Sequence, residues 1–237
     1  MTRTGLARAL SKLGHCSRSQ GTVLIRAGQV SLNGRICRNP EQPVFLGKDV
    51  IQIKEAPITA AEPIYLMLNK PRGLVTTAQD EAGRDTVYQC FQGAPLPHLS
   101  PVGRLDKASE GLLLFTNDNA WAHRITDPST HVDKTYHVQV SELLDDDRLA
   151  RLRRGAIHDG ELLSLRKVTL LRSGEKNCWL EITLDEGRNR HIRRVLEAHG
   201  LETLRLIRIS IGSLALSTLP KGQWRHLRPD EVAALRA

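Results

Sequence analysis

The chain has 237 residues, of which 40% are hydrophobic and 25% charged, a mixture typical of folded globular domains. No uncharged run approaches the ~18–20 residues of a membrane helix, and the first residues lack the apolar core of a secretory signal. We therefore expect a cytoplasmic protein without a membrane partner. The net charge of +8 indicates either a polyanionic partner, most often a nucleic acid, or a charge that serves only solubility.

The four cysteines lie far apart, without a Cys-x-x-Cys pair or a histidine at metal-ligand spacing. They are Cys16, Cys37, Cys90 and Cys178. We expect them to be free buried thiols and expect no metal site. The sequence also lacks a Gly-x-Gly-x-x-Gly motif and a P-loop lysine motif, so it gives no support for a nucleotide cofactor.

The positive charge is concentrated at the start of the chain. Residues 1–53 hold eight basic residues against two acidic ones, and so carry six of the eight net positive charges. Leucines on one stripe of residues 5–14 predict a helix, and a serine cap followed by Gly28 predicts a second helix over residues 17–28. Asn33-Gly34 then predicts a hairpin turn. A module of about fifty residues buries little surface, so we expect it to depend on a neighbouring domain or a ligand.

The rest of the chain is predicted to be one larger domain. Residues 54–63 mix alanine, proline and charge without periodicity, which predicts a linker to a domain over residues 64–237. Strand-like segments outnumber helical ones there and do not alternate regularly with them, which favours an α+β fold with a largely antiparallel sheet. We predict strands at 64–70, 111–118, 134–140 and 178–184, and helices at 119–128, 145–155 and 189–200.

The segment GRLDKASEGLLLFTND, residues 103–118, places Asp106 in a loop between two apolar segments. Scaffolds often present a functional side chain from such a loop. A turn also favours an aspartate whose carboxylate accepts backbone N–H groups. This segment alone leaves both interpretations open.

A second cluster, LDEGRNRHIRRVLEAHG, predicts a helix on which Asn189, Arg190 and Arg193 share one face. Arginines in the first turn of a helix oppose the helix dipole, and we expect Asp185 and Glu186 to offset part of that cost. The conflict indicates that these arginines hold a carboxylate or bind phosphates. The alternative is a solvated basic face.

Five ordered blocks carry a resemblance to a known family: NKPRGLVTT (69–77), GRLDKASEGLLLFTND (103–118), KTYHVQV (134–140), EGRNRHIRRV (186–195) and TLRLIRISIG (203–212). In order and approximate spacing the chain resembles the bacterial ribosomal-RNA pseudouridine synthases of the RsuA type. Most of residues 4–50 resembles the RNA-binding domain named after ribosomal protein S four, on the pattern of Arg26, Gly28, Val30, Leu32, Asn33 and Gly34.

This resemblance implies a pseudouridine synthase catalytic domain, α+β with a largely antiparallel mixed sheet, preceded by a small helix-helix-hairpin RNA-binding domain. The implied enzyme is an isomerase that flips a specific uridine out of ribosomal RNA and converts it to pseudouridine without a cofactor. The implied partner is ribosomal RNA or a pre-ribosomal particle, and we expect a monomer. The catalytic sequence blocks resemble those of enzymes that act on large-subunit ribosomal RNA somewhat more than those of small-subunit enzymes, which are similar.

The resemblance also implies roles by position. Asp106 is implied to be the catalytic group, Arg193 to pair with it, and Arg104 to enter the RNA stack in place of the flipped uridine. Tyr136 is implied to stack on the uracil, with its hydroxyl as a candidate base, although its phase with Val138 also fits an ordinary inward strand residue. The further RNA-binding residues in this assignment are Lys134, Asn189, Arg190 and Arg194 in the larger domain, and Arg18, Arg26 and Arg35 in the smaller one.

Some alternatives stay open at this point. His191, Ile192 and Val195 replace the family's usual Gln, Val and Met, but the arginines of the block are intact. An RNA-binding assembly factor without the chemistry is disfavoured because the three catalytic residues are present, and a tRNA-directed synthase is disfavoured by the front domain. The sequence does not decide whether the aspartate adds to the uracil ring, attacks the anomeric carbon or stabilises a glycal intermediate.

Overall fold

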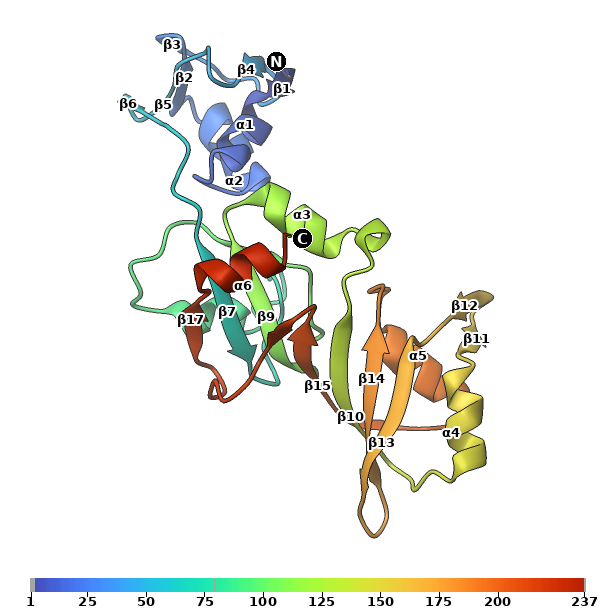
Figure 1. Cartoon of the computed structure of the whole chain (residues 1–237). Coiled ribbons are helices and arrows are strands. Elements are labelled where there is room, and N and C mark those ends of the chain that lie inside the picture. The colour runs from blue at the N-terminus through green and yellow to red at the C-terminus, as the bar shows by residue number, and fades with distance from the viewer. Residues whose placement is uncertain (1–2, 79, 237) are drawn as a thin grey trace. The chain divides into compact units, whose positions relative to one another are not determined.

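The computed structural model describes residues 3–78 and 80–236, which divide into two compact units (Figure 1). The first unit contains residues up to 65 together with residues 93–100 and 115–120, and the second contains the remainder. No helix within the described ranges is both long and apolar enough to cross a membrane.

Two short helices, α1 (Leu6–Lys12) and α2 (Arg18–Arg26), form the centre of the first unit. The predicted serine cap of the second helix is confirmed: Ser17 Oγ accepts the backbone N–H of Gln20 at 3.1 Å, and the Gln20 side chain accepts the backbone N–H of Ser17 at 2.9 Å. The helices pack on the first strands around a core of Leu6, Leu10, Ile25, Val30, Val44 and Ile51.

The strands of this unit form two small sheets. Strand β1 (Arg3–Gly5) pairs antiparallel with β4 (Pro43–Phe45). A four-stranded sheet has the order β3 (Arg35–Ile36), β2 (Val30–Leu32), β5 (Ile51–Ile53), β6 (Ala56–Pro57).

The predicted hairpin turn at Asn33-Gly34 is confirmed. The backbone φ angles there are 51° and 78°, the pair of left-handed conformations that a tight two-residue hairpin needs. Asn33 also fixes the turn to the next strand, because its Oδ1 accepts the backbone N–H of Val50 at 2.9 Å and its Nδ2 donates to Asp49 at 3.0 Å.

Residues 54–63, which the sequence predicts to be a linker, begin with regular structure. Lys54 and Glu55 have positive φ angles and close a hairpin between β5 and β6, so Ala56–Pro57 adds an edge strand to the sheet. Composition does not reveal this strand because its main-chain hydrogen bonds come from a neighbour in space. The domain boundaries drawn from the sequence remain a prediction.

The second unit is built on one mixed sheet with the strand order β13-β14-β10-β15-β9-β7-β17, and with β16 and β8 at its margins. The pairings along β13, β14, β10 and β15 are antiparallel, while β15 and β9 run parallel. The bounds are β7 Tyr65–Lys70, β8 Ser100–Val102, β9 Glu110–Thr116, β10 Lys134–Val140, β13 Lys167–Ser173, β14 Cys178–Leu184, β15 Thr203–Ile211, β16 Leu214–Ala215 and β17 Trp224–His226. This arrangement confirms the predicted α+β fold with a largely antiparallel mixed sheet.

Helices and a second hairpin complete this unit. The helices are α3 (Asn119–Thr126), α4 (Asp146–Arg153), α5 (His191–Ala198) and α6 (Pro229–Ala234), with 3-10 turns at Val87–Phe91 and Pro128–Thr130. Strands β11 (Ala156–His158) and β12 (Glu161–Leu163) form a separate hairpin that contacts α5. In Figure 1, α5 lies behind β13 and β14.

All four cysteines are free, but only Cys16 and Cys178 are buried. Cys37 and Cys90 are partly exposed, so the prediction of buried thiols was wrong for these two. Cys37 directly follows the two-residue strand β3, and Cys90 lies in a short 3-10 turn, where there is little packing to cover a side chain.

Candidate active site

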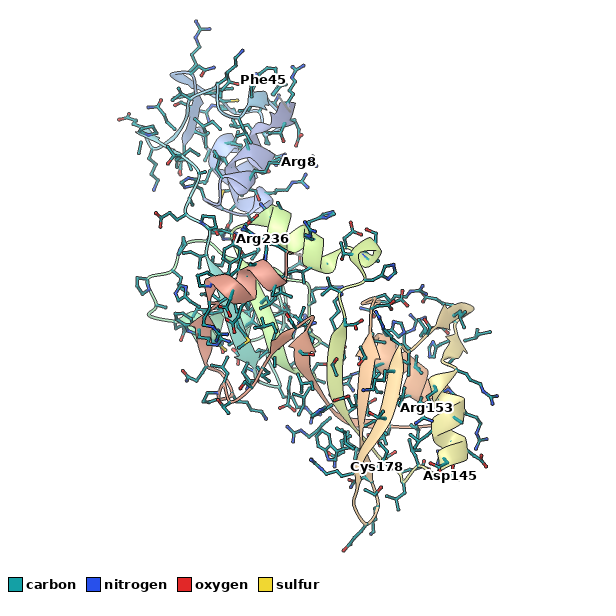
Figure 2. The ribbon with its side chains drawn as sticks, viewed as in Figure 1. Arg8, Phe45, Asp145, Arg153, Cys178 and Arg236 are labelled. Atoms are coloured by element: carbon teal, nitrogen blue, oxygen red, sulfur yellow. The ribbon has the colours of Figure 1, made fainter. Side chains whose placement is uncertain are left out.

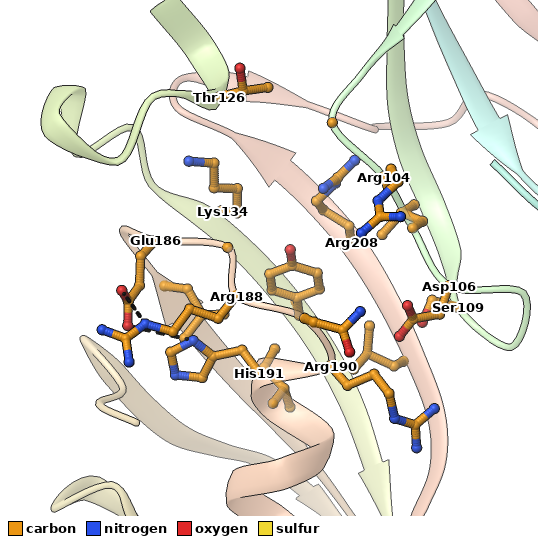
Figure 3. Close-up of a pocket in the computed structure, with 18 of the residues that line it drawn as sticks. Arg104, Asp106, Ser109, Thr126, Lys134, Glu186, Arg188, Arg190, His191 and Arg208 are labelled. Carbon is orange, nitrogen blue, oxygen red and sulfur yellow. Dashed lines mark hydrogen bonds and ion pairs between the residues drawn. The ribbon is translucent and has the colours of Figure 1, made fainter. Parts of the chain in front are cut away.

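A pocket of about 560 Å³ opens in the second unit, between the loop before β9 and the start of α5 (Figure 3). Its floor is formed by β10 and β15, which contribute Tyr136 and Arg208. The charged side chains that line it are Arg104, Asp106, Lys134, Glu186, Arg188, Arg190, Arg193 and Arg208. Cations outnumber carboxylates in this lining, which favours an anionic ligand.

The loop that carries Asp106 is fastened through its main chain. The hydroxyl of Thr76 donates to the carbonyl of Leu105 at 2.7 Å, and the backbone N–H of Gly73 donates to the carbonyl of Lys107 at 2.8 Å. The ammonium of Lys70 donates to the carbonyl of Ser109 at 2.8 Å. Residues 70–76, just after β7, therefore fix the loop without engaging its functional side chains.

The Asp106 carboxylate takes no part in closing its own turn. The turn is closed by the main-chain carbonyl of Asp106, which accepts the N–H of Ser109 at 2.9 Å. Within the described part of the chain, no hydrogen bond or ion pair of the carboxylate is formed. Figure 3 shows the carboxylate turned toward the pocket. The turn-capping interpretation of this side chain is therefore wrong.

Lys70 supports the loop of Asp106 although it does not line the pocket, and the sequence analysis did not identify it. Its side chain is fully buried at 0% exposure. Burial lowers the pKa of its ammonium to about 8, and this shift is opposed by the charges of Glu110 and Asp106. The sequence could have indicated this residue, because Lys70 ends an apolar strand in which every residue from Leu66 onward is buried.

The predicted ion pair between Asp106 and Arg193 is absent: the two groups do not approach within 4.0 Å in the described structure. Arg193 lies in the same pocket but is held by main-chain carbonyls, with Nη2 donating to Ala108 at 3.4 Å and Nη1 to Thr203 at 3.5 Å. Burial, together with the charge of Arg190, lowers the pKa of Arg193, and the charge of Asp106 opposes this shift. Because these carbonyls fix the guanidinium, Arg193 contacts the loop of Asp106 and leaves its carboxylate free.

Helix α5 begins two residues later than the sequence predicts. Arg190 precedes its first turn with a φ angle of 51° and a ψ angle of 29°, and the helix starts at His191. Asn189 and Arg190 therefore do not share a helical face with Arg193, although all three line the pocket. The chain must turn sharply between β14 and α5, and a left-handed residue makes that turn.

The arginines of this helix start are compensated by a carboxylate from another element. Arg194 pairs with Glu161 at 2.7 Å and lies outside the pocket. Of the carboxylates expected to offset the dipole conflict, Asp185 lies 3.2 Å from His131, and Glu186 pairs with Arg188 at 2.9 Å. Glu186 therefore compensates one arginine of this block, as expected, whereas Asp185 pairs elsewhere. Glu161 adds a carboxylate from the β11–β12 hairpin, whose approach is set by tertiary packing.

Tyr136 occupies the floor of the pocket on β10, with 8% of its surface exposed. It is in phase with the buried residues Val138 and Val140, as the alternation predicts. Its ring therefore packs as a strand residue while it also lines the pocket. No hydrogen bond to its hydroxyl is formed within residues 3–78 and 80–236.

Arg208 is a second residue that the sequence analysis did not identify. It lies directly opposite Tyr136 in the β10–β15 register and is 5% exposed. The sequence could have indicated this residue, because Arg208 is two positions after the buried Leu206 and so points to the same, buried face of β15. Gly111 on β9 faces it, and a Cβ there would collide with the Arg208 main chain. Glycine therefore allows β9, and the loop before it, to lie close to β15.

His191, which replaces the family's glutamine, supplies a structural contact. The side chain is 3% exposed, and its Nε2 lies 2.9 Å from the carbonyl of Ser164. Burial lowers the pKa of His191, and the Glu186 carboxylate, 3.6 Å from Nδ1, opposes this shift. The ring therefore joins the start of α5 to the segment that follows β12.

The remaining predicted RNA-binding residues are accessible. Arg104, Asn189 and Arg190 are exposed at the pocket, and Lys134 is half-buried in it. In the first unit, Arg18 and the other predicted basic residues, Arg26 and Arg35, are exposed. Arg8 also projects outward from α1 (Figure 2).

Comparisons with known proteins match the chain over nearly its whole length. Residues 64–198 match the family of RNA pseudouridylate synthases, and residues 4–51 match the S4 domain. The chain is 35% identical to ribosomal large subunit pseudouridine synthase B of Bacillus subtilis, over 98% of this chain and 95% of the relative. It is 36% identical to the protein of the same name from Escherichia coli O157:H7, over 98% of this chain and 82% of the relative.

Solved structures agree with these matches. A crystal structure described as a pseudouridylate synthase has a TM-score of 0.69 and 31% identity, covering 98% of this chain and 99% of that chain. A chain of the archaeal box H/ACA sRNP Nop10-Cbf5 complex, at 15% identity, has a TM-score of 0.51 over 66% of this chain and 50% of its own, and shows a likeness of fold alone. Since the matched family covers more than half of the sequence and the relatives cover nearly all of it, the chain belongs to the RNA pseudouridylate synthase family.

Proposed function

We propose that this protein converts a specific uridine of large-subunit ribosomal RNA to pseudouridine, with Asp106 as the catalytic carboxylate. Family membership supports the reaction, and the names of the similar Bacillus and Escherichia proteins support the RNA. The observation that carries the role of Asp106 is its carboxylate, which is turned into a cationic pocket by a loop whose own contacts are made by the main chain.

The residue types suit the reaction. The bond between uracil N1 and the ribose breaks, the base rotates, and C5 bonds to the same ribose carbon, while a proton leaves C5 and N1 gains one. No electrons are transferred to another molecule and no group is added. An ionised Asp106 serves this sequence as a nucleophile toward the ring or the anomeric carbon, or as the partner of a developing positive charge on the sugar.

Tyr136 and the surrounding cations hold the flipped nucleotide in this proposal. A base stacked on the Tyr136 ring gains about 1–3 kcal/mol, and the tyrosine hydroxyl is a candidate base for the C5 proton. Arg104 fills the gap that the flipped uridine leaves in the RNA stack. Arg190 and Asn189 lie at the exposed side of the pocket, where the flanking RNA backbone passes.

The first unit anchors the RNA in this proposal. We assign residues 1–53 to RNA binding and residues 64–237 to catalysis, with exposed Arg18, Arg26 and Arg35 contacting phosphates. The proposed enzyme acts as a monomer. Arg194 is assigned to positioning α5 through Glu161, because it lies outside the pocket.

The test is a pseudouridine map of ribosomal RNA from cells that lack this protein. We expect one modified position to be lost, to return with the wild-type protein, and to remain absent with Asp106→Asn, because an amide cannot supply the carboxylate charge. The matched control is Asp147→Asn, which alters an exposed aspartate on α4 far along the sequence and should restore the position fully.

The outcomes separate the alternatives. An unchanged map in the deletion strain would contradict the proposed function and support a binding factor without chemistry. Full restoration of the modified position by Asp106→Asn would show that this carboxylate is not the catalytic group. A lost position in small-subunit RNA or in tRNA would correct the substrate.

A further inference from the structure

Arg208 is a buried cation without a counter-ion. Only 5% of its surface is exposed, and the single hydrogen bond of its side chain within the described residues runs from Nε to the carbonyl of Leu112 at 2.7 Å. Its Nη2 is fully buried and has no partner. Leaving a charged donor buried and unpaired costs free energy, so a guanidinium held this way in a pocket wall points to a ligand.

A second cation faces the same space from the neighbouring strand. Lys134 lines the pocket at the start of β10, is half-buried, and makes no ion pair within the described residues. Burial lowers the pKa of its ammonium, and the charge of Arg208 lowers it further. Figure 3 shows both side chains among the residues that line the pocket. Two cations that repel each other in a partly buried wall would both be stabilised by one anion.

We propose that Lys134 and Arg208 form a subsite for a phosphate group of the nucleotide whose base stacks on Tyr136. Arg208 is the direct cross-strand neighbour of Tyr136, a separation of about 5 Å between their backbones. A phosphate bound by Arg208 therefore lies within one nucleotide of a base on the tyrosine ring. The uracil itself is neutral, and its carbonyl oxygens would leave the two charges uncompensated.

This inference rests on the proposed function, because it takes a flipped uridine as the pocket's ligand. It adds a role that the catalytic residues do not have. Asp106 acts at the bond between base and sugar, whereas Lys134 and Arg208 would hold the sugar-phosphate backbone and so fix the depth to which the nucleotide enters.

The test uses the full chain and three small probes: uridine, uridine 5′-monophosphate and uridine 3′-monophosphate. Dissociation constants are measured from amide chemical-shift titrations by NMR. With wild-type protein we expect at least one monophosphate to bind roughly tenfold more tightly than uridine, as a charge-assisted contact would give. We expect Lys134→Gln and Arg208→Gln each to reduce this preference, the ratio of the two dissociation constants, to less than about twofold.

The control is Arg151→Gln, which removes an exposed cation on α4 and should leave the phosphate preference at its wild-type value. Amide-shift dispersion reports whether Arg208→Gln is folded, and Lys134→Gln provides the same comparison without changing a buried residue. The proposal is overturned if wild type shows no phosphate preference, or if folded Lys134→Gln retains it in full.

The binding measurement does not depend on isomerisation. A phosphate preference that needs Lys134 in a protein with an unchanged pseudouridine map would refute the proposed function and leave the subsite standing. A lost modification in the deletion strain together with no phosphate preference would refute the subsite alone.

Discussion

At the scale of single residues, the loop of Asp106 is held by two cations, the fully buried Lys70 and the half-buried Arg193. The Lys70 ammonium fixes the loop of Asp106 by donating to the carbonyl of Ser109 at 2.8 Å. It also donates to the carbonyl of Pro71 at 3.1 Å. Arg193 contacts the same loop at Ala108. Both side chains therefore position the loop of Asp106, and neither pairs with its carboxylate within the described residues.

Lys70 gives a pH dependence of stability with a definite sign. The pKa of its ammonium is about 8 in the folded protein against 10.5 for an unperturbed lysine, so the unfolded chain holds this proton more tightly. Between pH 8 and 10.5 the unfolded state therefore binds more protons, and the free energy of unfolding should rise with pH. The full effect is on the order of 3 kcal/mol.

We expect Lys70→Met to remove this contribution. Denaturant unfolding of wild type and variant at several pH values from 7 to 10.5 should show their stability difference shifting in favour of the wild type as pH rises. Lys176→Met, at an exposed position before β14, is the control and should show a constant difference. A constant difference for Lys70→Met as well would show that the buried lysine keeps its ordinary pKa.

At the scale of elements, the pocket exists because β9 and β15 approach closely. Their parallel pairing brings Glu110 opposite Ile207 and Gly111 opposite Arg208. Gly111 has a φ angle of 99°, and a Cβ there would overlap the main chain of Arg208. The loop of Asp106 comes directly before β9, so the same contact sets its distance from the pocket floor.

Gly111→Ala should therefore be strongly destabilising, by about 3 kcal/mol or more, because two strands must separate. The matched control is Gly200→Ala after α5, where φ is 71° and the space around an added Cβ is open. There only the left-handed backbone opposes alanine, at about 1–2 kcal/mol. Urea unfolding of the two variants measures the comparison. Equal losses would mean that close packing of β9 on β15 contributes nothing beyond backbone conformation.

Several elements were predicted from the sequence, but their ends were less predictable, and the long strands β13 and β15 were not predicted. Apolar and polar residues alternate in 134–140, which correctly predicts the buried face of β10 with Tyr136, Val138 and Val140. The capping serine gives the start of α2. The start of α5 was missed because Arg190 adopts a left-handed conformation, which side-chain periodicity does not encode. Strand β6 was missed because an edge strand of two residues has no pattern of its own.

At the scale of the whole molecule, charge is distributed unevenly along the chain. Six of the eight net positive charges lie in residues 1–53, and the pocket of the second unit is also lined mainly by cations. RNA binding that uses both regions should release many counterions and depend steeply on salt.

Replacing Arg18, Arg26 and Arg35 together by glutamine should weaken RNA binding and flatten its salt dependence. Each lost phosphate contact reduces the magnitude of the negative slope of log K against log salt by about 0.7–0.9. The measurement is binding of transcribed large-subunit ribosomal RNA at several potassium chloride concentrations. The control replaces three exposed cations of the second unit, Arg151, Arg154 and Lys176, and should leave the slope unchanged. A slope that stays at the wild-type value in the first variant would exclude these arginines from phosphate contact.

The sequence by itself determined several of the elements, the α+β class and the family, because each depends on local periodicity, capping residues and the order of short blocks. It also identified the loop of Asp106, but not what its carboxylate does. Only the tertiary structure decided that the turn is closed by main-chain atoms, that Arg193 does not pair with Asp106, and that Lys70 and Arg208 are buried in the site. The hydrogen bonds of the buried Lys70 and Arg208 join residues 39 and 96 positions apart. Such contacts arise from how strands pack, which no single stretch of sequence specifies.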